Sequence, residues 1–402
     1  MGNIKSTSYT RLQKVSMALL ALLPLLAWYK IPFPVGLGYA LLLFLSVYTI
    51  IWKGFRINIL PRTFWIVCVY ICFMWMYSHD FDVWTIFPPG GWNFFIFLLA
   101  LIWGIMTFNI VLLKKFMRWV VLISGILFWI QFILVIATGS PQFCFVPNLT
   151  GSFTYEDLKY ADVVARHMVS LPSSIFLEKS YLAYYFLAYL ALCWFETGKK
   201  DKLFSKEIIF VTATLIASRS GTALVGFSLL FAIKIISTYW AIDIRHRVTM
   251  IIFIVPLILG VFFIFVRTEM GQQMLSRSSE FSTEESSGYT RVVGGYIMFD
   301  QLSTDQKIIG ISDARERFSI ERMDGSIKFF ANGVQTILLN LGYIGALLYF
   351  LFYADVYRRS NLTSKMCIIL LLIMSLLESN YLNPFMMLLT IVPCANVIRN
   401  NI

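Results

Sequence analysis

The chain has 402 residues, of which 58% are apolar and only 14% are charged. This composition excludes an ordinary soluble domain, in which about 25% of residues are charged. The formal net charge of +11 does not indicate a nucleic-acid partner, because much of the Lys and Arg falls in short segments between apolar stretches. The sequence predicts an all-α, polytopic membrane protein.

Apolar stretches of helix length recur from one end of the chain to the other. A bilayer core about 30 Å thick needs about 20 such residues in a helix, and open backbone groups in lipid would lack hydrogen-bond partners. The sequence predicts about 12 membrane spans. They are Val15–Tyr29, Val35–Trp52, Phe64–Tyr77, Trp92–Leu113, Trp119–Ala137, Tyr181–Phe195, Ile208–Ala217, Thr222–Ile236, Val248–Val266, Gly333–Phe352, Met366–Leu377 and Phe385–Ile398.

Short segments rich in Lys and Arg fall between alternate spans and at both termini. The positive-inside rule places these segments, and with them both termini, on the cytoplasmic side. They hold Lys5, Arg11 and Lys14; Lys53, Arg56 and Arg62; Lys114, Lys115 and Arg118; Lys199, Lys200, Lys202 and Lys206; Arg245 and Arg247; and Arg358, Arg359, Lys365 and Arg399. Two long polar segments, residues 138–180 and 267–332, are then extracytoplasmic loops of a single integral membrane domain, residues 1–402.

The second loop carries a candidate phosphate-binding arginine. Residues Gly288–Leu302 have a partly apolar face, which predicts a helix lying in the membrane interface with Arg291 near its start. A guanidinium group donates two parallel hydrogen bonds to phosphate oxygens and stays charged. The alternative is that arginines of this loop pair with neighbouring Asp and Glu and only solvate it.

Arg219 is a second candidate. It follows the short span Ile208–Ala217, is flanked by Ser218 and Ser220, and has no Asp or Glu nearby in the sequence. An arginine at the membrane rim without a local partner is costly, which suggests a function. The alternative is that its side chain reaches the lipid headgroups.

The end of the first loop offers two candidate bases. Glu178 stands at the start of the span that begins near Tyr181, where the helix dipole favours a carboxylate, so capping alone could explain it. His167 could accept a proton near neutral pH, although a lone surface histidine usually has no such role. No metal-ligand spacing occurs.

Four stretches resemble motifs of the O-antigen polymerase and ligase superfamily. TLIASRSGTALVGF is similar to the family's Ser-Arg motif at the outer end of a span. YTRVVGGYIMFDQLSTDQKIIGIS resembles its arginine helix and glycine turn, with Arg291 and Gly310 on the motif positions. IFLEKSYLAYYFLAYLAL resembles the Phe-x-Glu segment of Wzy-type polymerases, which places Glu178 on the motif glutamate.

The fourth stretch, ANGVQTILLNLGYIGALLYFLF, resembles the family's His-Asn motif and the following Gly-x-x-Gly helix. It matches at Asn332, Gly342 and Gly345, but Ala331 stands where ligases carry the histidine assigned as their base. The proline that usually precedes the glycine turn is missing, and Ser312 replaces the second glycine of that turn. The missing histidine favours a polymerase over a ligase.

The resemblance implies a metal-independent membrane glycosyltransferase without a cofactor, in the bacterial cytoplasmic (inner) membrane. It would join repeat units carried on undecaprenyl pyrophosphate into O-antigen or a similar surface polysaccharide, as in lipopolysaccharide biosynthesis. The implied partners are the lipid-linked glycan, membrane lipid and a chain-length regulator (a co-polymerase), with no nucleic acid. The alternatives are an O-antigen ligase, a lipid-linked oligosaccharide flippase or transporter, and a sensor or scaffold.

The resemblance also distributes roles among the candidate residues. The preferred base is Glu178, with His167 as the alternative. The expected pyrophosphate ligands are Arg291 and Arg219, followed by Arg166. The expected glycan, lid or other substrate contacts are Arg315, Arg317, Arg322 and Asn332.

Overall fold

A computed structural model describes residues 10–27, 29, 37–53, 61–78, 89–139, 141–144, 172–176, 178–196, 205–241, 267, 272, 290–318, 320–321, 327–328, 331–377 and 384–400. Within these residues the structure is helical, apart from turns and one short antiparallel pair of strands. The strands are β1 (Ile320–Glu321) and β2 (Ile327–Lys328). The expected all-α fold class is therefore confirmed for the described part of the chain.

The longer helices follow the apolar stretches of the sequence. They are α1 (Arg11–Leu26), α2 (Leu37–Lys53), α3 (Arg62–Ser78), α4 (Pro89–Thr107), α5 (Ile110–Thr138), α7 (Lys179–Trp194), α8 (Lys206–Ala217), α9 (Gly221–Ala241), α16 (Gly333–Arg359), α17 (Leu362–Leu377) and α18 (Pro384–Asn400). Shorter elements occupy the predicted loops: the 3-10 helix η3 (Pro141–Cys144), the π-helical turn η5 (Thr290–Gly294), α13 (Gly295–Asp300), α14 (Thr304–Ile309) and α15 (Ala314–Phe318).

Among the described residues, three stretches are long and apolar enough to cross a membrane. They are Ile110–Thr138, Gly221–Tyr239 and Gly333–Arg359. Shorter apolar helices accompany them, within α2, α3, α4, α17 and α18. The chain is therefore a helical membrane protein, as its composition predicts.

One predicted boundary is wrong. The apolar run Trp92–Leu113 was expected to form a single span, but α4 ends at Thr107 and α5 begins at Ile110. The physical cause is Asn109, whose side-chain oxygen accepts hydrogen bonds from the backbone amides of Val111 and Leu112, both at 3.1 Å. Hydropathy does not register this helix cap.

The basic residues that were expected in a turn between two spans lie instead within a helix. Lys114, Lys115 and Arg118 lie on α5, which continues without interruption to Thr138. Each other predicted span matches a helix, except Val248–Val266, which lies outside the described residues.

Helix α7 is one of the most deeply buried helices of the bundle, together with α18. Its side chains are buried on every face from Tyr181 to Trp194, apart from the partly buried Cys193. A helix that is apolar all round is stable only where other helices cover it, and α7 contacts α5, α8, α9, α17 and α18. A side chain placed at the end of α7 is therefore held by the rigid centre of the molecule.

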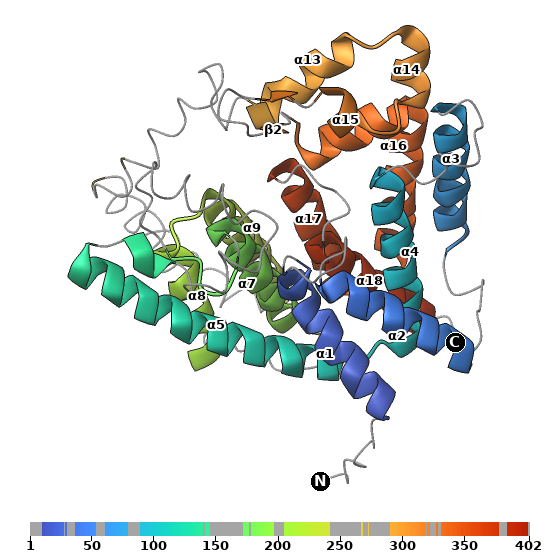
Figure 1. Ribbon diagram of the computed structural model, residues 1–402. Coiled ribbons are helices and arrows are strands. Elements are labelled where there is room, and N and C mark those ends of the chain that lie inside the picture. The colour runs from blue at the N-terminus through green and yellow to red at the C-terminus, as the bar shows by residue number, and fades with distance from the viewer. Residues whose placement is uncertain are drawn as a thin grey trace.

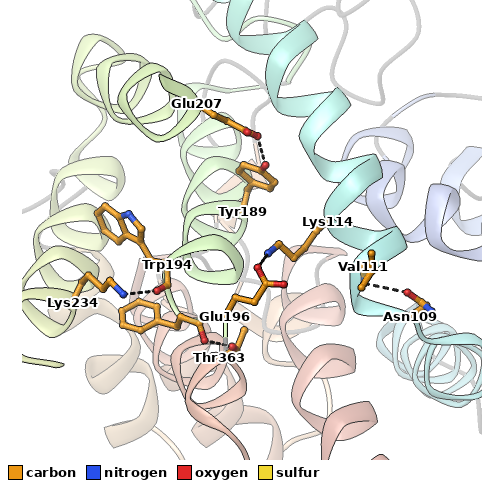
Figure 2. A network of polar contacts seen from close by, with 10 residues as sticks. Asn109, Val111, Lys114, Tyr189, Trp194, Glu196, Glu207, Lys234 and Thr363 are labelled. Atoms are coloured by element: carbon orange, nitrogen blue, oxygen red, sulfur yellow. Dashed lines mark hydrogen bonds and ion pairs between the residues drawn. The ribbon is translucent and has the colours of Figure 1, made fainter. Parts of the chain in front are cut away.

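The contacts of α7 define one end of the bundle, which we call the basic end. Lys114 Nζ near the start of α5 lies 2.5 Å from Glu196 Oε2, just past the end of α7. Lys234 Nζ of α9 donates to the carbonyl oxygen of Trp194 at 2.7 Å. Thr363 at the start of α17 bonds the carbonyl of Phe195. Figure 2 shows these contacts together.

We call the opposite end of the bundle, where α7 and α9 begin and α8 ends, the loop end. Here the hydroxyl of Tyr29 donates to the carbonyl oxygen of Ile175, just before α7, and Tyr181 stacks on Phe385 at the start of α18. The loop helices α13, α14 and α15 contact α16 and gather beside its upper part in Figure 1. The side of the membrane that each end faces stays a prediction.

Candidate functional site

Glu178 lies at the loop end, directly before the first turn of α7. It occupies the N-cap position with extended backbone angles (φ −140°, ψ 158°), but its side chain makes no capping hydrogen bond. Instead Glu178 Oε2 accepts a hydrogen bond from Ser180 Oγ at 2.9 Å, and the side chain is exposed. The carboxylate is thus carried by the buried helix α7, remains accessible and does not cap that helix.

The segment before Glu178 is fastened to α5. The backbone amide of Ser174 donates to Gln131 Oε1 at 2.9 Å, and its hydroxyl donates to the carbonyl of Ser124 at 2.7 Å. Ser174 has a positive φ of 59° and is fully buried, so the turn is held by specific contacts. The neighbouring amide of Ser173 donates to the carbonyl of Cys144, whose thiol is buried, and burial raises the pKa of that thiol.

Arg219 lies in the tight turn that joins α8 to α9. Its φ of 47° puts it in the left-handed region, which costs a non-glycine residue about 1 kcal/mol. The turn is held by the buried hydroxyl of Ser218, which donates to the carbonyl of Leu215 at 2.7 Å. The Arg219 side chain is exposed, and no ion pair within the described residues involves it.

Helices α7 and α9 place Glu178 and Arg219 at similar positions along the axis of the helix bundle. The two helices run in the same direction, because Leu187 packs against Gly226 and Trp194 meets Lys234 one helical segment further on. With a rise of about 1.5 Å per residue, Glu178 lies about 13 Å from Leu187 along the axis, and Arg219 lies about 10 Å from Gly226. Both charged residues therefore belong to the loop end.

Arg291 lies in the π-helical turn η5, which continues directly into α13. The interfacial helix expected over Gly288–Leu302 is thus present from Thr290 to Asp300. π-Helical turns are rare and often mark functional sites. One face of the helix buries Met298 and Phe299, whereas a second, apolar face is exposed at Val292, Tyr296 and Ile297. The exposed face fits the predicted position in the membrane interface.

The glycines expected from the family resemblance meet at one junction. Gly310 (φ 101°) ends α14, and Gly342 (φ 63°) breaks α16. A Cβ atom on Gly310 would lie 2.3 Å from the carbonyl oxygen of Asn340, and one on Gly342 would lie 2.4 Å from that of Ile308. Only glycine satisfies both the backbone angles and the space at these positions.

Tyr70 of α3 fastens this junction from the side. Its hydroxyl lies 2.8 Å from the carbonyl oxygen of Ile309 and 3.0 Å from that of Leu341. Gly345, the third motif glycine, makes room for the Tyr70 ring, because a Cβ there would lie 2.4 Å from a ring carbon. The glycine motif therefore attaches the arginine-bearing loop to the helix bundle.

Two further motif positions have structural roles. Asn332 is buried and caps α16, since its side-chain oxygen accepts from the backbone amide of Gln335 at 2.9 Å. A contact between Asn332 and substrate stays a prediction. Ala331, where ligases carry histidine, is buried in a small apolar cluster. That cluster also contains Met298, Phe299, Leu302, Ala314 and Leu339.

The other predicted site residues are less constrained by the structure. Arg315 and Arg317 lie on the short helix α15. The guanidinium of Arg317 is exposed and lies 5.5 Å from the ring centroid of Phe318. His167, Arg166 and Arg322 lie outside the described residues, so the alternative base and these two arginines stay predictions.

The sequence reasoning missed two residues that organise this region, Gln335 and Tyr70. The spacing Asn332-x-x-Gln335 is a capping-box pattern and could have drawn attention to Gln335. Tyr70 is one aromatic residue within an apolar span, and nothing in its local sequence distinguishes it.

The site therefore consists of an exposed carboxylate, an exposed guanidinium in a strained turn, and a π-helical turn that carries a second arginine. No group of His, Cys, Asp and Glu suited to a metal ion occurs in the described part of the chain. In comparisons with known proteins, no family model matches the chain and no curated protein matches it. The fold and site define a helical membrane protein with an exposed carboxylate, Glu178, and an exposed guanidinium, Arg219, at the loop end of its bundle.

Proposed function

We propose that this chain is a membrane glycosyltransferase that polymerises oligosaccharide repeat units linked to undecaprenyl pyrophosphate. It works at the outer face of the bacterial cytoplasmic membrane with about 12 spans, with residues 138–180 and 267–332 outside and both termini inside. The observation that carries the proposal is the exposure of Glu178 and Arg219 at the loop end, where no ion pair within the described residues involves either.

The proposed reaction assigns a task to each of these groups. The acceptor sugar's hydroxyl oxygen attacks the anomeric carbon of the donor glycan and forms the new glycosidic bond. The bond from that carbon to the pyrophosphate oxygen breaks, and the lipid pyrophosphate leaves with the electron pair. Glu178 takes the hydroxyl proton as the general base. Arg219 and Arg291 stabilise the negative charge that develops on the leaving pyrophosphate.

The distribution of basic residues supports the orientation. Lys114 and Arg118 lie near the start of α5, and Arg359 and Lys365 lie where α16 ends and α17 begins. All four therefore belong to the basic end, which the positive-inside rule assigns to the cytoplasm. The loop end then faces the outer side of the membrane, where the proposed polymerisation takes place.

The surroundings of Ala331 support polymerase over ligase. Its side chain is buried among apolar residues of α13, α15 and α16, so this position offers no proton acceptor. A histidine there would have to enter the packed cluster or reorganise it. The base must therefore come from another position, such as Glu178.

The break in α16 at Gly342 calls for a comparison with transporters, in which broken helices line substrate sites near the midplane of the membrane. Here the backbone carbonyls beside the break accept hydrogen bonds from another segment of the protein. The amides of Ile311 and Ser312 donate to the carbonyls of Leu339 and Asn340, both at 3.1 Å. The break therefore serves as a docking point for the loop, which favours an enzyme over a flippase.

The decisive experiment is to delete the gene from its source strain and resolve the cell-surface glycolipid on a gel. Loss of the ladder, with a single repeat unit left on the core, supports the polymerase. Bare core with polymer retained on the lipid carrier would indicate a ligase, and bare core with single units trapped in the cytoplasmic leaflet would indicate a flippase. An unchanged ladder would contradict all three functions.

Complementation then tests the site. Arg291→Ala is expected to insert normally and to leave the ladder absent, because the leaving pyrophosphate loses a guanidinium partner. Arg359→Ala is the matched control. It removes an arginine that pairs with Asp355 at 2.8 Å at the basic end, so this variant should restore the ladder. A normal ladder with Arg291→Ala would remove this residue from the site.

A further inference from the structure

Gln335 uses both ends of its side-chain amide, and the two ends serve different helices. Its oxygen accepts from the backbone amide of Asn332 at 3.0 Å and completes the capping box of α16. Its nitrogen donates to the carbonyl oxygen of Val292 in η5 at 2.8 Å. Gln335 is only 2% exposed, so a side-chain amide that lost either bond would itself be left as a buried polar group without that partner.

The second bond, from the side-chain nitrogen of Gln335, ends on the carbonyl oxygen of Val292, the residue that follows Arg291. In a π-helical turn the backbone bonds reach one residue further than in an α-helix, so the regular bonding pattern changes where η5 passes into α13. The Gln335 amide supplies a donor to a carbonyl in this irregular turn. It therefore fixes the backbone position of the turn relative to α16.

Gly295 makes this contact possible. A Cβ atom at that position would lie 2.5 Å from Gln335 Oε1 and 2.6 Å from Gln335 Cβ, well inside van der Waals contact. The first residue of α13 thus has to lack a side chain for the glutamine to reach Val292. Gly295 and Gln335 fit each other across a separation of 40 residues in the sequence.

The other anchor of this helix lies further from the arginine. Met298 and Phe299 bury their side chains in the small apolar cluster against α16, about two turns beyond Arg291. On the remaining side, the side chains of Val292, Tyr296 and Ile297 are exposed. The Gln335 amide thus contacts the backbone one residue from Arg291, nearer along the chain than the buried Met298 and Phe299.

We propose that Gln335 is a positioning residue for Arg291, which acts by holding the carbonyl of Val292 and so setting where the guanidinium meets the pyrophosphate. This inference rests on the proposed function, since it assigns Gln335 a task in the same reaction. Gln335 itself touches neither substrate nor reacting atoms. Its effect is transmitted through the backbone of η5.

Gln335→Glu separates the two roles of the side chain. A carboxylate keeps the acceptor for the Asn332 amide and is favoured in the first turn of a helix, but it has no donor for the Val292 carbonyl. Because a buried carboxylate carries a desolvation cost, Gln335→Met is a second variant that removes the donor with no added charge. Both are compared in purified full-length protein with a lipid-linked repeat unit as substrate.

Gln306 offers matched controls. It occupies the same N3 position in the capping box of α14, where its oxygen accepts from the Ser303 amide at 3.3 Å. No described hydrogen bond links its side chain to another helix. Gln306→Glu and Gln306→Met therefore make the same chemical changes in the same loop without touching the bond to Val292.

The first measurement is hydrogen–deuterium exchange over residues 290–295, which does not depend on any activity. Both Gln335 variants are expected to exchange faster there, whereas the amides of α17 keep their protection and the Gln306 variants match the parent. Unchanged exchange over 290–295 in both Gln335 variants would overturn the inference and leave the proposed function standing.

The second measurement is turnover. The Gln335 variants are expected to lower kcat on the order of 10- to 100-fold, with a smaller change in KM, because a misplaced group mainly loses transition-state contacts. Combined with Arg291→Lys, the Gln335 variants should add little further loss. Faster exchange with normal kcat, or full additivity with Arg291→Lys, would overturn the positioning role. Normal kcat in Arg291→Ala would instead overturn the proposed function at this site.

Discussion

Within the described part of the chain, Lys114 and Arg118 at the basic end of the helix bundle are paired, whereas Glu178 and Arg219 at the loop end are not, although the loop helices also hold the pair Lys307–Asp300 at 3.7 Å. At the basic end, Lys114 pairs with Glu196 at 2.5 Å, and Arg118 pairs with Glu207 at 3.1 Å (Figure 2 shows the first pair). At the loop end, Glu178 and Arg219 are exposed and take part in no ion pair within the described residues. Paired charges join neighbouring helices, whereas charges without an ionic partner remain available to a ligand.

Lys234 shows that a charged residue within an apolar span has a structural role when its charge is paired with a group of the protein. A lysine within an apolar span suggests a functional site by default. In this protein, however, Lys234 is 3% exposed, donates to the carbonyl of Trp194 at 2.7 Å and lies 5.5 Å from the ring centroid of Phe195. A cation is favoured at the end of a helix, so Lys234 closes the end of α7 and has a structural role.

The largest expected effect at the loop end comes from Glu178→Gln. Removing the proposed general base should lower turnover by about 10²- to 10⁴-fold. The thermal unfolding midpoint in detergent should stay close to that of the parent, because the carboxylate makes no capping bond to α7. Turnover within a few-fold of the parent would leave Glu178 without a catalytic role and would favour His167 as the base.

Two substitutions of Arg219 separate the effect of its charge on turnover from the effect of its backbone strain on stability. Arg219→Ala and Arg219→Gly should both lower turnover by about 10²- to 10³-fold, since each removes a proposed donor to the leaving pyrophosphate. Glycine has no Cβ to strain at φ 47°, so the glycine variant should be the more stable of the two by about 1 kcal/mol. Equal unfolding midpoints would show that the turn stores no strain, and normal turnover would leave Arg219 as a lipid anchor.

The basic end should respond in the opposite way. Glu196→Gln is expected to destabilise the protein by about 1–3 kcal/mol, because Lys114 loses its charged partner in a partly buried site. Turnover per folded molecule should remain at the parental value. A large loss of turnover with unchanged stability would remove the distinction between the two ends.

The smallest expected effect concerns the attachment of the loop. Tyr70→Phe removes a hydroxyl that meets two carbonyls, which should cost about 1 kcal/mol of stability and speed amide exchange over residues 308–312. Tyr185→Phe is the control, since its hydroxyl donates to the carbonyl of Ala21 at 2.7 Å within the bundle. The control should show a similar stability loss with unchanged exchange in the loop, and faster exchange there in both variants would contradict the role of Tyr70.

Much of the fold could be predicted from local sequence. Apolar runs of helix length predict most of the helices, and the amphipathic pattern of Gly288–Leu302 predicts the helix that carries Arg291. The helix boundary at Asn109 could also have been predicted from the sequence, because asparagine is a strong N-cap residue. It was missed because a hydropathy window sums over side chains and does not detect a single hydrogen-bonded cap.

The sequence by itself therefore determined the helical membrane class, most helix positions and the residues with unusual charge, since these depend on hydropathy and local chemistry. Only the tertiary structure decided that Glu178 does not cap α7, that Gly310 faces Gly342, and that Gln335 holds the turn beside Arg291. These features depend on hydrogen bonds and close contacts between segments far apart in the chain. Their partners come together only when the helices pack, and no local pattern records that packing.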